Sequence, residues 1–419
     1  MIEDLRSRCL NLLFLSELFY PHGGGAELAT HLYAKLLSES GIKVVVVTNR
    51  FSGEKELSRD GNLTVYRLPL FKSSSSSKYS VLSRLDVQFS SLMRRLLKWS
   101  SVVYIPRLWY SAVPLAKAYR KPAIVHVHDY SPICPLSILY DSSNRRVCRN
   151  RKVCSARCIW QFERSKRRGL RDSILSLSLN LSARLPLGKC VEQADAVVCV
   201  SKAQRKILTE NMPLIRHKAH VVYNPLPDIS PVEINGEDFG YLGGFNRLKG
   251  FEVLCNSLSL ASDHEFKVHV TGASISSETA NEPVGEEGFF SRIGIVFHEK
   301  LRRSDQVSFY RQIKGVIFPS IVEEPLPYVV AEAILRGRLL IASRIGGVPE
   351  QVKGCKGVFL FEAGNYRELA EVLDCVKSLD RSTVADLGFQ GREVFRRTFN
   401  NGKTIAEFQK IVYDLTCER

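Results

Sequence analysis

Two glutamates frame a short apolar stretch in the second half of the chain. The segment EEPLPYVVAE places Glu324 eight residues before Glu332, with two prolines between them. A carboxylate costs free energy wherever water is partly excluded, so two of them around an apolar segment need partners. One could accept hydrogen bonds from hydroxyl groups at one end of a ligand, and the other from hydroxyls at the far end. The structural alternative is that Glu324 caps a helix beginning near Pro327, while Glu332 faces solvent.

Three glycine-rich turns could bring backbone N–H groups close to a bound anion. They lie in the segments PHGGGAE, GYLGGFNRLKG and SRIGGVPE. Glycine lets the backbone approach a ligand closely, and a helix N-terminus offers unpaired N–H groups to a phosphate. Each turn on its own equally fits a simple chain reversal. The residues of interest in these turns are Gly24, Gly25, Gly244, Arg247, Lys249, Gly346 and Gly347.

Expected strands and helices alternate along most of the chain. Residues 11–18 are apolar enough for a buried strand, residues 26–40 have the periodicity of an amphipathic helix, and IKVVVVT is a second buried strand. A strand, a helix and a second strand in this order form a βαβ unit. Further apolar strands follow, with helices expected over 251–260 and 328–335. The pattern predicts an α/β protein with two doubly wound, Rossmann-like domains.

Length and composition agree with two domains. A chain of 419 residues is longer than one ordinary hydrophobic core requires, and NPLPDISPVEING, rich in Pro, Asn, Asp and Gly, marks a boundary near residues 225–236.

The apolar run near the start of the sequence is interrupted by Glu17 and PHGGG, which predicts a buried strand and not a signal peptide. No run of 18 apolar residues occurs, so we do not expect a spanning helix.

Several motifs, taken together and in order, resemble a known family. GGAE, HVHD, ADAVVCVS, LGGFNRLKG, FPS followed by E-x7-E, and GGVPE occur between about residues 11 and 352. This set resembles the retaining GT-B glycosyltransferases of family 4. The resemblance implies two domains facing across a cleft: an N-terminal acceptor-binding domain over 1–230 and a C-terminal donor-binding domain over 231–395. It also implies that the last segment, 396–419, forms a helix that crosses back to the N-terminal domain.

The resemblance assigns roles to individual residues. Glu332 is expected to hold the ribose hydroxyls of a nucleotide-sugar donor, a UDP-, GDP- or ADP-sugar. Glu324 is expected to contact the transferred sugar, with His128 near that sugar and the Lys249 charge on the diphosphate; we take Glu324, His128 and Lys249 as the catalytic set. Further donor-binding residues by the same resemblance are Gly24, Gly25, Gly244, Arg247, Ser320, Tyr328, Val329, Gly346 and Gly347.

The expected reaction is transfer with retention at the anomeric carbon and without a metal. No Asp-x-Asp motif is present, and fixed N–H dipoles and cations can stabilise the charge on a departing nucleoside diphosphate. Two positions depart from the family pattern: Gly244 stands where an Arg is common, and Pro327 stands where a Gly is common and lacks an N–H. We expect no cofactor for catalysis.

A cysteine- and arginine-rich insert lies near residues 131–190. Four thiolates this close in sequence could hold a structural Zn, although no CxxC spacing occurs. Unliganded thiols and an iron–sulfur site are the alternatives. From 145 to 171 there are eleven Lys or Arg and one acidic residue. The four cysteines are Cys134, Cys148, Cys154 and Cys158.

The net charge of +16 favours anionic partners. With the acceptor on the N-terminal domain, the basic insert suggests a lipid-linked or glycan acceptor and peripheral contact with an anionic membrane. Residues 82–99 form either a basic amphipathic helix on that membrane or a surface helix packed inward. Seven of the eleven cysteines are scattered along the chain, several in apolar surroundings. They indicate a reducing compartment, so we expect the cytoplasmic, inner face of the membrane.

Three other functions fit parts of the sequence. A sugar-nucleotide epimerase of the same fold needs no second substrate, so the basic insert counts against it. A catalytically silent scaffold is disfavoured by the presence of Glu324, Glu332 and Lys249. A non-catalytic Zn-containing protein that binds nucleic acid remains an alternative, but the insert has no regular aromatic spacing for base stacking, so we do not expect nucleic acid as the partner.

Overall fold

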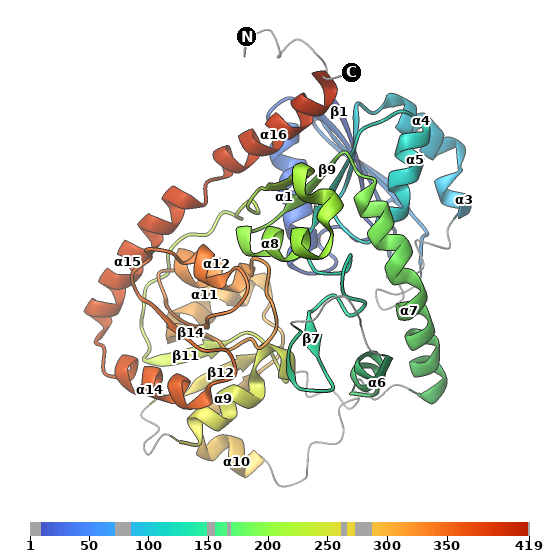
Figure 1. Ribbon diagram of the computed structural model, residues 1–419. Helices are drawn as coiled ribbons and strands as arrows, with labels where there is room; N and C mark the ends of the chain where they lie inside the picture. The colour runs from blue at the N-terminus through green and yellow to red at the C-terminus, as the bar shows by residue number, and fades with distance from the viewer. Residues whose placement is uncertain are drawn as a thin grey trace. The chain divides into compact units, whose positions relative to one another are not determined.

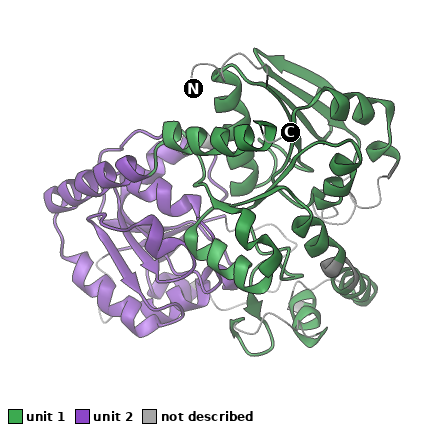
Figure 2. Ribbon diagram, turned by 45° about the horizontal axis from the view of Figure 1, so that its top comes forward, with its two compact units in different colours: residues 1–227, 399–419 green, residues 228–398 purple. Residues whose placement is uncertain are grey.

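The chain divides into two compact units (Figure 2). The computed structural model describes residues 10–71, 85–148, 156–165, 169–260, 266–272 and 287–417. Unit 1 comprises residues 1–227 and 399–419, and unit 2 comprises residues 228–398. The sequence placed these boundaries at 230/231 and 395/396. The predicted fold class, two Rossmann-like α/β units with parallel sheets, is confirmed.

Unit 1 is built on a sheet in the order β10-β9-β6-β5-β1-β2-β4-β3. Neighbouring strands are parallel except β3 and β4, which pair antiparallel. β1, β2, β5, β6 and β9 are buried almost throughout, because their Val, Leu and Ile runs are covered on both faces. The strands are β1 (Asn11–Leu15), β2 (Lys43–Asn49), β3 (Leu57–Asp60), β4 (Leu63–Leu68), β5 (Val102–Ile105), β6 (Ala123–Val127), β9 (Ala196–Cys199) and β10 (Ala219–Val221).

Helices cover both faces of this sheet, and a small hairpin stands outside it (Figure 1). The hairpin consists of β7 (Tyr140–Asp141) and β8 (Arg146–Val147). The helices are α1 (Gly25–Glu39), α3 (Leu85–Gln88), α4 (Ser91–Trp99), η3 (Trp109–Ser111), α5 (Ala112–Ala118), α6 (Ala156–Ser165), α7 (Leu170–Glu192), α8 (Lys202–Asn211), η4 (Pro213–Lys218) and α16 (Asn401–Cys417).

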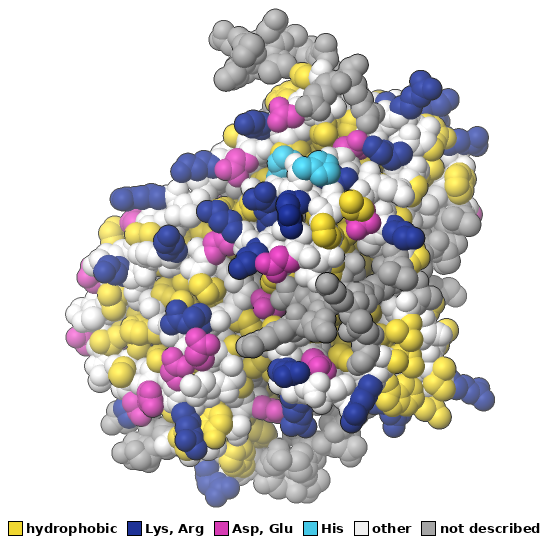
Figure 3. Space-filling view, viewed as in Figure 1, with side chains coloured by type: hydrophobic (Ala, Val, Ile, Leu, Met, Phe, Trp, Pro, Cys, Tyr) yellow, Lys and Arg dark blue, Asp and Glu magenta, His cyan; other side chains and the backbone are white. Residues whose placement is uncertain are grey.

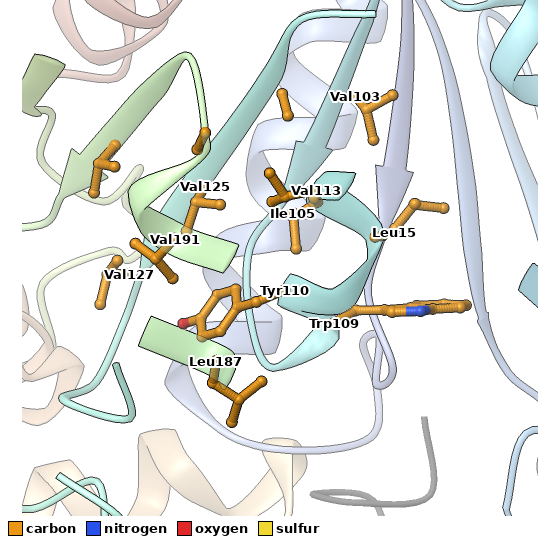
Figure 4. Packing of buried hydrophobic residues seen from close by; sticks show 14 of the residues in the cluster. Leu15, Val103, Ile105, Trp109, Tyr110, Val113, Val125, Val127, Leu187 and Val191 are labelled. Carbon is orange, nitrogen blue, oxygen red and sulfur yellow. The ribbon is translucent and has the colours of Figure 1, made fainter. Parts of the chain in front are cut away.

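One side of the sheet packs on a large aromatic and aliphatic core. Trp109, which is fully buried, lies beside Ile105 and Leu15, and Tyr110 lies between the sheet and α7 (Figure 4). The helical side of this layer is supplied by Leu187 of α7 and its neighbours. This core fixes the carboxyl ends of β1, β5 and β6, from which the candidate site residues of unit 1 extend.

Residues 85–99, the described part of the segment 82–99, do not form one amphipathic helix. Helix α3 ends at Gln88 and α4 begins at Ser91, with Ser90 accepting a hydrogen bond from the Met93 N–H as the N-cap. The apolar side of α4 is buried in unit 1 through Met93, Leu96 and Leu97. This is the inward-packed alternative, so the apolar face of α4 is not available to a membrane.

The last helix, α16, belongs to unit 1. Its apolar side, which includes Ile405, Phe408 and Val412, joins the second core cluster of that unit, and the Phe408 ring lies 5.2 Å from that of Tyr33. The chain therefore returns to unit 1 after residue 398. No helix in the described ranges has the length and apolar character needed to cross a membrane.

Unit 2 has a six-stranded parallel sheet in the order β13-β12-β11-β14-β15-β16. Counted along the chain this is 3-2-1-4-5-6, the strand order of dinucleotide-binding Rossmann folds. The strands are β11 (Asp238–Tyr241), β12 (Val268–Thr271), β13 (Ile295–His298), β14 (Ile313–Phe318), β15 (Leu339–Ser343) and β16 (Val358–Phe361). The helices are η5 (Arg247–Lys249), α9 (Phe251–Leu258), α10 (Glu287–Arg292), α11 (Arg303–Gln312), α12 (Tyr328–Leu335), α13 (Val348–Gln351), α14 (Tyr366–Lys377) and α15 (Arg381–Thr398).

Candidate active site

The topology of unit 2 marks one place for a ligand. After β11 the chain runs to β12 and β13 on one side, and after β13 it crosses to β14 on the other side of β11. The carboxyl ends of β11 and β14 are therefore adjacent at the switch point, where open α/β sheets bind ligands. The loops that follow these two strands carry Lys249 and Glu324.

Lys249, Glu324 and Ser320 come together at this switch point. The Lys249 Nζ lies 2.5 Å from Glu324 Oε1, and the Ser320 hydroxyl donates to the same oxygen at 3.1 Å. The Lys249 side chain is 41% exposed while that of Glu324 is 12% exposed, so the cation lies at the surface and the carboxylate below it. A cation placed this way can meet the phosphates of a ligand, and the carboxylate can accept from its hydroxyl groups.

Backbone contacts hold the two loops together. The Ile321 N–H donates to the Leu248 carbonyl at 3.1 Å, which ties the loop after β14 to η5. Gly250 has φ +87°, and a Cβ there would lie 1.8 Å from the Pro319 carbonyl oxygen. Only glycine permits this approach without movement of the backbone, so Gly250 is needed to bring Lys249 to Glu324.

The third glycine turn packs directly on Glu324. The Gly347 N–H donates to the Glu324 carbonyl at 2.8 Å. Gly346 has φ +55°, and a Cβ there would lie 2.2 Å from the same carbonyl oxygen. Gly346 and Gly347 therefore act on Glu324 by fixing its backbone, and the Gly347 N–H is already occupied.

Glu332 lies one turn inside α12, on the same side of the helix as Tyr328. Burial raises the pKa of Glu332, and the charge of Arg336 opposes this shift. Burial raises the pKa of Tyr328 as well, and the Glu332 charge adds to that increase. Pro327 is the N-cap and makes no capping side-chain hydrogen bond to the first turn. Val329 is half-buried in that same turn.

Two predicted donor residues have other partners. Arg247 Nε lies 3.1 Å from Glu252 Oε2 in an exposed ion pair on η5 and α9. The Gly244 N–H donates to the Thr271 carbonyl at 3.0 Å. The Gly244 N–H is thus used within the sheet edge, and a role for Arg247 on phosphate stays a prediction.

Unit 1 has a second switch point, between β1 and β5, and it holds a buried charge cluster. Arg107, two residues after β5, pairs with Glu27, and its Nε lies 3.2 Å from Glu17 Oε1. Glu27 also accepts from the Gly24 N–H at 2.6 Å, at the start of α1. Gly24 and Gly25 are exposed at the start of this helix. The Gly24 N–H is therefore engaged with Glu27, whereas Gly25 opens α1.

His128 follows β6 at the same sheet edge. Its ring stacks on that of His126 at 4.2 Å, and His126 accepts or donates a hydrogen bond of 2.7 Å with the Tyr104 hydroxyl. Burial, together with the charge of Arg107, lowers the pKa of His128 to about 3. His128 is therefore a neutral group whose buried Nε2 has no hydrogen-bond partner among the described residues.

Glu17 and Arg107 were not among the site residues predicted from the sequence. Glu17 is fully buried, and burial raises the pKa of its carboxyl, while Arg107 opposes the shift. A single carboxylate directly after the buried run LNLLFLS, and a single cation after VVYIP, were the available signals. Charged residues at the carboxyl ends of two central parallel strands are expected to meet.

The cysteine cluster is only partly described. Cys134 and Cys158 are buried and Cys148 is half-buried, whereas Cys154 lies outside the described residues. The Cys158 thiol donates to the Tyr140 carbonyl and accepts from the Ser142 N–H, and burial raises its pKa. Within the described ranges, no three His, Cys, Asp or Glu side chains form a metal-binding group. The structural Zn stays a prediction.

Solved structures share this fold over nearly the whole chain. Sucrose-phosphate synthase from Thermosynechococcus elongatus has a TM-score of 0.72 and 14% identity, covering 98% of this chain and 100% of that chain. Anabaena HepE in complex with UDP-glucose has a TM-score of 0.62 and 16% identity, covering 97% of this chain and 100% of that chain. At such identities the likeness shows the fold alone.

Comparison with protein families shows which class of enzyme the chain belongs to. Residues 23–228 match Glycosyltransferase Family 4, and residues 236–376 match Glycosyl transferases group 1. The chain is therefore a glycosyltransferase of the GT-B type. An uncharacterized 42.6 kDa protein in the cps region of Klebsiella pneumoniae is 21% identical to it over 371 residues, 84% of this chain and 90% of that protein.

Proposed function

We propose that this glycosyltransferase moves a sugar from a nucleoside-diphosphate sugar to a lipid-linked or glycan acceptor. The observation that carries the donor assignment is the contact of Lys249 with Glu324 at the switch point of unit 2. It joins a cation that suits a diphosphate to a carboxylate that suits sugar hydroxyls. UDP-sugars are the first donors to test, because Anabaena HepE, which shares the fold, has been solved with UDP-glucose.

Glu332 is proposed to hold the ribose. Two adjacent hydroxyls can donate to one carboxylate, and such charge-assisted hydrogen bonds are stronger than neutral ones. Its partial burial costs free energy in the folded protein, as the raised pKa indicates. A side chain that lowers the stability of the folded protein in this way is typical of a binding site, where function and not stability requires it.

The chemistry proposed for the leaving group is electrostatic. The bond from the anomeric carbon to the diphosphate oxygen breaks, and the negative charge collects on the diphosphate. Lys249 and the backbone dipoles of the neighbouring loops can stabilise this charge without reorganisation. We propose that transfer proceeds with retention at the anomeric carbon and without a metal, as the family resemblance implies.

An apolar stripe on α7 supports a membrane-bound acceptor. Leu170, Ile174, Leu175 and Leu181 are 57%, 53%, 60% and 43% exposed, although Ser173 on the inner side of the helix is fully buried. Figure 3 shows hydrophobic side chains gathered where Figure 1 places α7, with Lys and Arg side chains beside them. An apolar surface with basic neighbours fits peripheral contact with an anionic membrane.

The donor assignment is tested by measuring thermal stabilisation of the purified protein with UDP-, GDP- and ADP-sugars. We expect one nucleotide series to raise the melting temperature, and Glu332→Ala to remove the effect. Failure of every series to stabilise folded protein would refute the donor site. With the active donor, proton NMR of the product anomer tests retention, activity in EDTA tests metal independence, and metal analysis of the protein tests the structural Zn.

A further inference from the structure

A cavity in unit 2 lies away from the proposed donor site. It has a volume of about 430 Å³ and is lined by residues that precede β11, residues that precede β15, and one face of α15. Because the sheet is parallel, these amino ends share one edge, opposite the edge that carries Glu324. β15 has five residues, so the two edges are separated by roughly 16 Å. The volume is within the range of small-molecule sites.

Four arginines line this cavity against one acidic side chain. Arg336 and Arg338 lie in the short connection between α12 and β15, and Arg381 and Arg392 come from α15. The acidic lining residue is Glu233. α15 packs closely on the turn after α12, since a Cβ at Gly388 would lie 2.2 Å from the Gly337 carbonyl oxygen. The packing of the two helices therefore gathers the guanidinium groups around one space.

Arg338 forms a buried positive floor. It is 2% exposed and donates to the carbonyls of Tyr310 at 2.8 Å and Glu233 at 2.9 Å. No carboxylate in the described parts of the chain lies within ion-pair distance of its guanidinium. Burial lowers the pKa of Arg338 to about 10, so the group is still charged at neutral pH. A buried charge satisfied only by carbonyl dipoles favours an anion in the neighbouring space.

The other three arginines keep donors available. Each guanidinium has five N–H donors, and among the described residues each side chain donates one hydrogen bond. Arg381 forms an ion pair with Glu237, and Arg392 Nη1 lies 3.9 Å from Glu393 Oε1. The acceptor is the Ser230 carbonyl for Arg336, Glu237 for Arg381 and the Leu335 carbonyl for Arg392. The forked geometry of a guanidinium matches the oxygens of a phosphate.

The rest of the lining is apolar and includes an exposed aromatic ring. Phe389 on α15 is 63% exposed, and Ile234 and Ala385 lie on the same cavity. The exposed ring gives the cavity an apolar surface beside the guanidinium groups, on which the body of a ligand could pack. This combination fits a ligand with an anionic head and an apolar or aromatic body.

We infer that this arginine pocket binds a small organic phosphate at a second site of unit 2, distinct from the donor site. The phosphate contacts Arg336, Arg381 and Arg392 above the buried Arg338, and the body of the ligand packs on Phe389. The inference rests on contacts within unit 2 alone and holds whether or not the proposed donor is correct.

The test uses phenyl phosphate and inorganic phosphate as probes in calorimetric titrations of the full chain. We expect saturable binding of phenyl phosphate by the wild type. Arg381→Gln and Arg392→Gln should each weaken it at least about tenfold, the loss typical of a charged hydrogen bond. Phe389→Ala should weaken phenyl phosphate and leave inorganic phosphate unchanged. Arg396→Gln, at an exposed arginine of the same helix, is the matched control and should bind as the wild type does.

Three results would overturn the inference. The first is no saturable binding at millimolar phenyl phosphate by folded wild-type protein. The second is binding that survives in both Arg381→Gln and Arg392→Gln. The third is binding abolished by Lys249→Gln alone, which would assign the anion to the donor site. UDP-sugar binding measured in the same variants keeps failure of this pocket separate from failure of the donor site.

Discussion

Lys249 Nζ and Glu324 Oε1 lie 2.5 Å apart, although they are 75 residues apart in the chain. The contact exists because the switch in strand order places the ends of β11 and β14 side by side. The pair is partly exposed, so its own contribution to stability is small. Its role is to position the two groups: it holds a cation and a carboxylate side by side, where the diphosphate and the sugar of a donor would contact them.

Loss of the Lys249 charge should impair the reaction more than the fold. We expect Lys249→Gln to lower kcat/KM for the nucleotide sugar by about 10² to 10³, the usual effect of removing one group that stabilises a leaving anion. Lys267→Gln, at an exposed lysine before β12, is the matched control and should retain activity. Equal losses in both variants, measured by initial rates, would contradict the role of Lys249.

A double-mutant cycle separates the pair from the ligand. Glu324→Gln, Lys249→Gln and the double variant should each change the free energy of unfolding by no more than about 1 kcal/mol in urea titrations, as for other partly exposed ion pairs. The same variants should lose most of their activity. A large coupling energy in unfolding, with activity retained, would show that the pair is structural.

Much of the fold could be predicted from the sequence, because a strand buried in a parallel sheet appears as a continuous run of apolar residues. The runs around β2, β6 and β15 are continuously apolar, and α12 begins and ends at the predicted residues 328 and 335. The predicted helix over 251–260 ends two residues early, at Leu258. The last helix, predicted within 396–419, extends from Asn401 to Cys417. Helix ends depend on caps and local packing, which periodicity does not contain.

The site was only partly predictable, since partners distant in sequence leave no local signal. The glycine turns and both glutamates could be picked out, but the packing of Gly346 on the Glu324 backbone could not. Arg107 and Glu17 could not be paired from their spacing, because the order of β1 and β5 in the sheet decides it. One continuous helix was expected over 82–99, but a new helix, α4, begins after the N-cap Ser90.

Glu332 should make the free protein less stable at neutral pH. Burial raises the pKa of its carboxyl, so its contribution to stability is present at acid pH and is lost as the pH rises through that raised pKa. We therefore expect Glu332→Gln to increase the free energy of unfolding by about 1 kcal/mol at pH 7.5, as for other functional groups that cost stability. The gain should vanish at acid pH.

The same variant should bind the donor at least about tenfold more weakly, because charged hydrogen bonds to ribose are lost. Glu371→Gln, at an exposed glutamate of α14, is the control for both measurements. Thermal melts at two pH values, with and without UDP-sugar, check the prediction. Destabilisation of the free protein by Glu332→Gln at pH 7.5 would show that the carboxylate supports the fold.

The stacked pair His126 and His128 should make the protein sensitive to acid. Their pKa values are lowered by burial, that of His128 from 6.5 to about 3. Below pH 6.5 the unfolded chain takes up protons that the folded chain does not, so stability is lost as the pH falls. The slope is up to about 1.4 kcal/mol per pH unit for each histidine.

His128→Gln removes one of these groups and should flatten the fall in unfolding free energy between pH 6.5 and pH 4. His217→Gln, at an exposed histidine of unit 1, is the matched control. Urea titrations across this pH range measure the slope. Identical slopes in wild type and His128→Gln would mean that the imidazole is protonated in the folded protein.

The exposed stripe on α7 should contribute to membrane binding. We expect the double variant Ile174→Ser and Leu175→Ser to reduce co-sedimentation with vesicles of anionic lipid several-fold, because buried apolar area and charge attraction both contribute to such binding. Leu214→Ser, at a 63% exposed leucine of η4, is the control. Equal binding of the double variant and the wild type would rule out α7 as the contact.

Replacement of Gly346 should show how strongly Glu324 depends on its backbone. Gly346 has φ +55°, and an alanine Cβ would lie 2.2 Å from the Glu324 carbonyl oxygen. Gly364 also has positive φ, +85°, but a Cβ there meets nothing within 4 Å. Gly364→Ala should therefore cost only the conformational strain, about 1 kcal/mol.

Gly346→Ala should cost more, because the loop that carries Glu324 must also move. A displacement of this carboxylate by about 1 Å is expected to lower kcat by about 10², whereas Gly364→Ala should leave kcat unchanged. Unfolding free energies and initial rates of the two variants separate strain from displacement. If Gly346→Ala retained full activity while losing no more stability than Gly364→Ala, the contact with Glu324 would not be what positions the carboxylate.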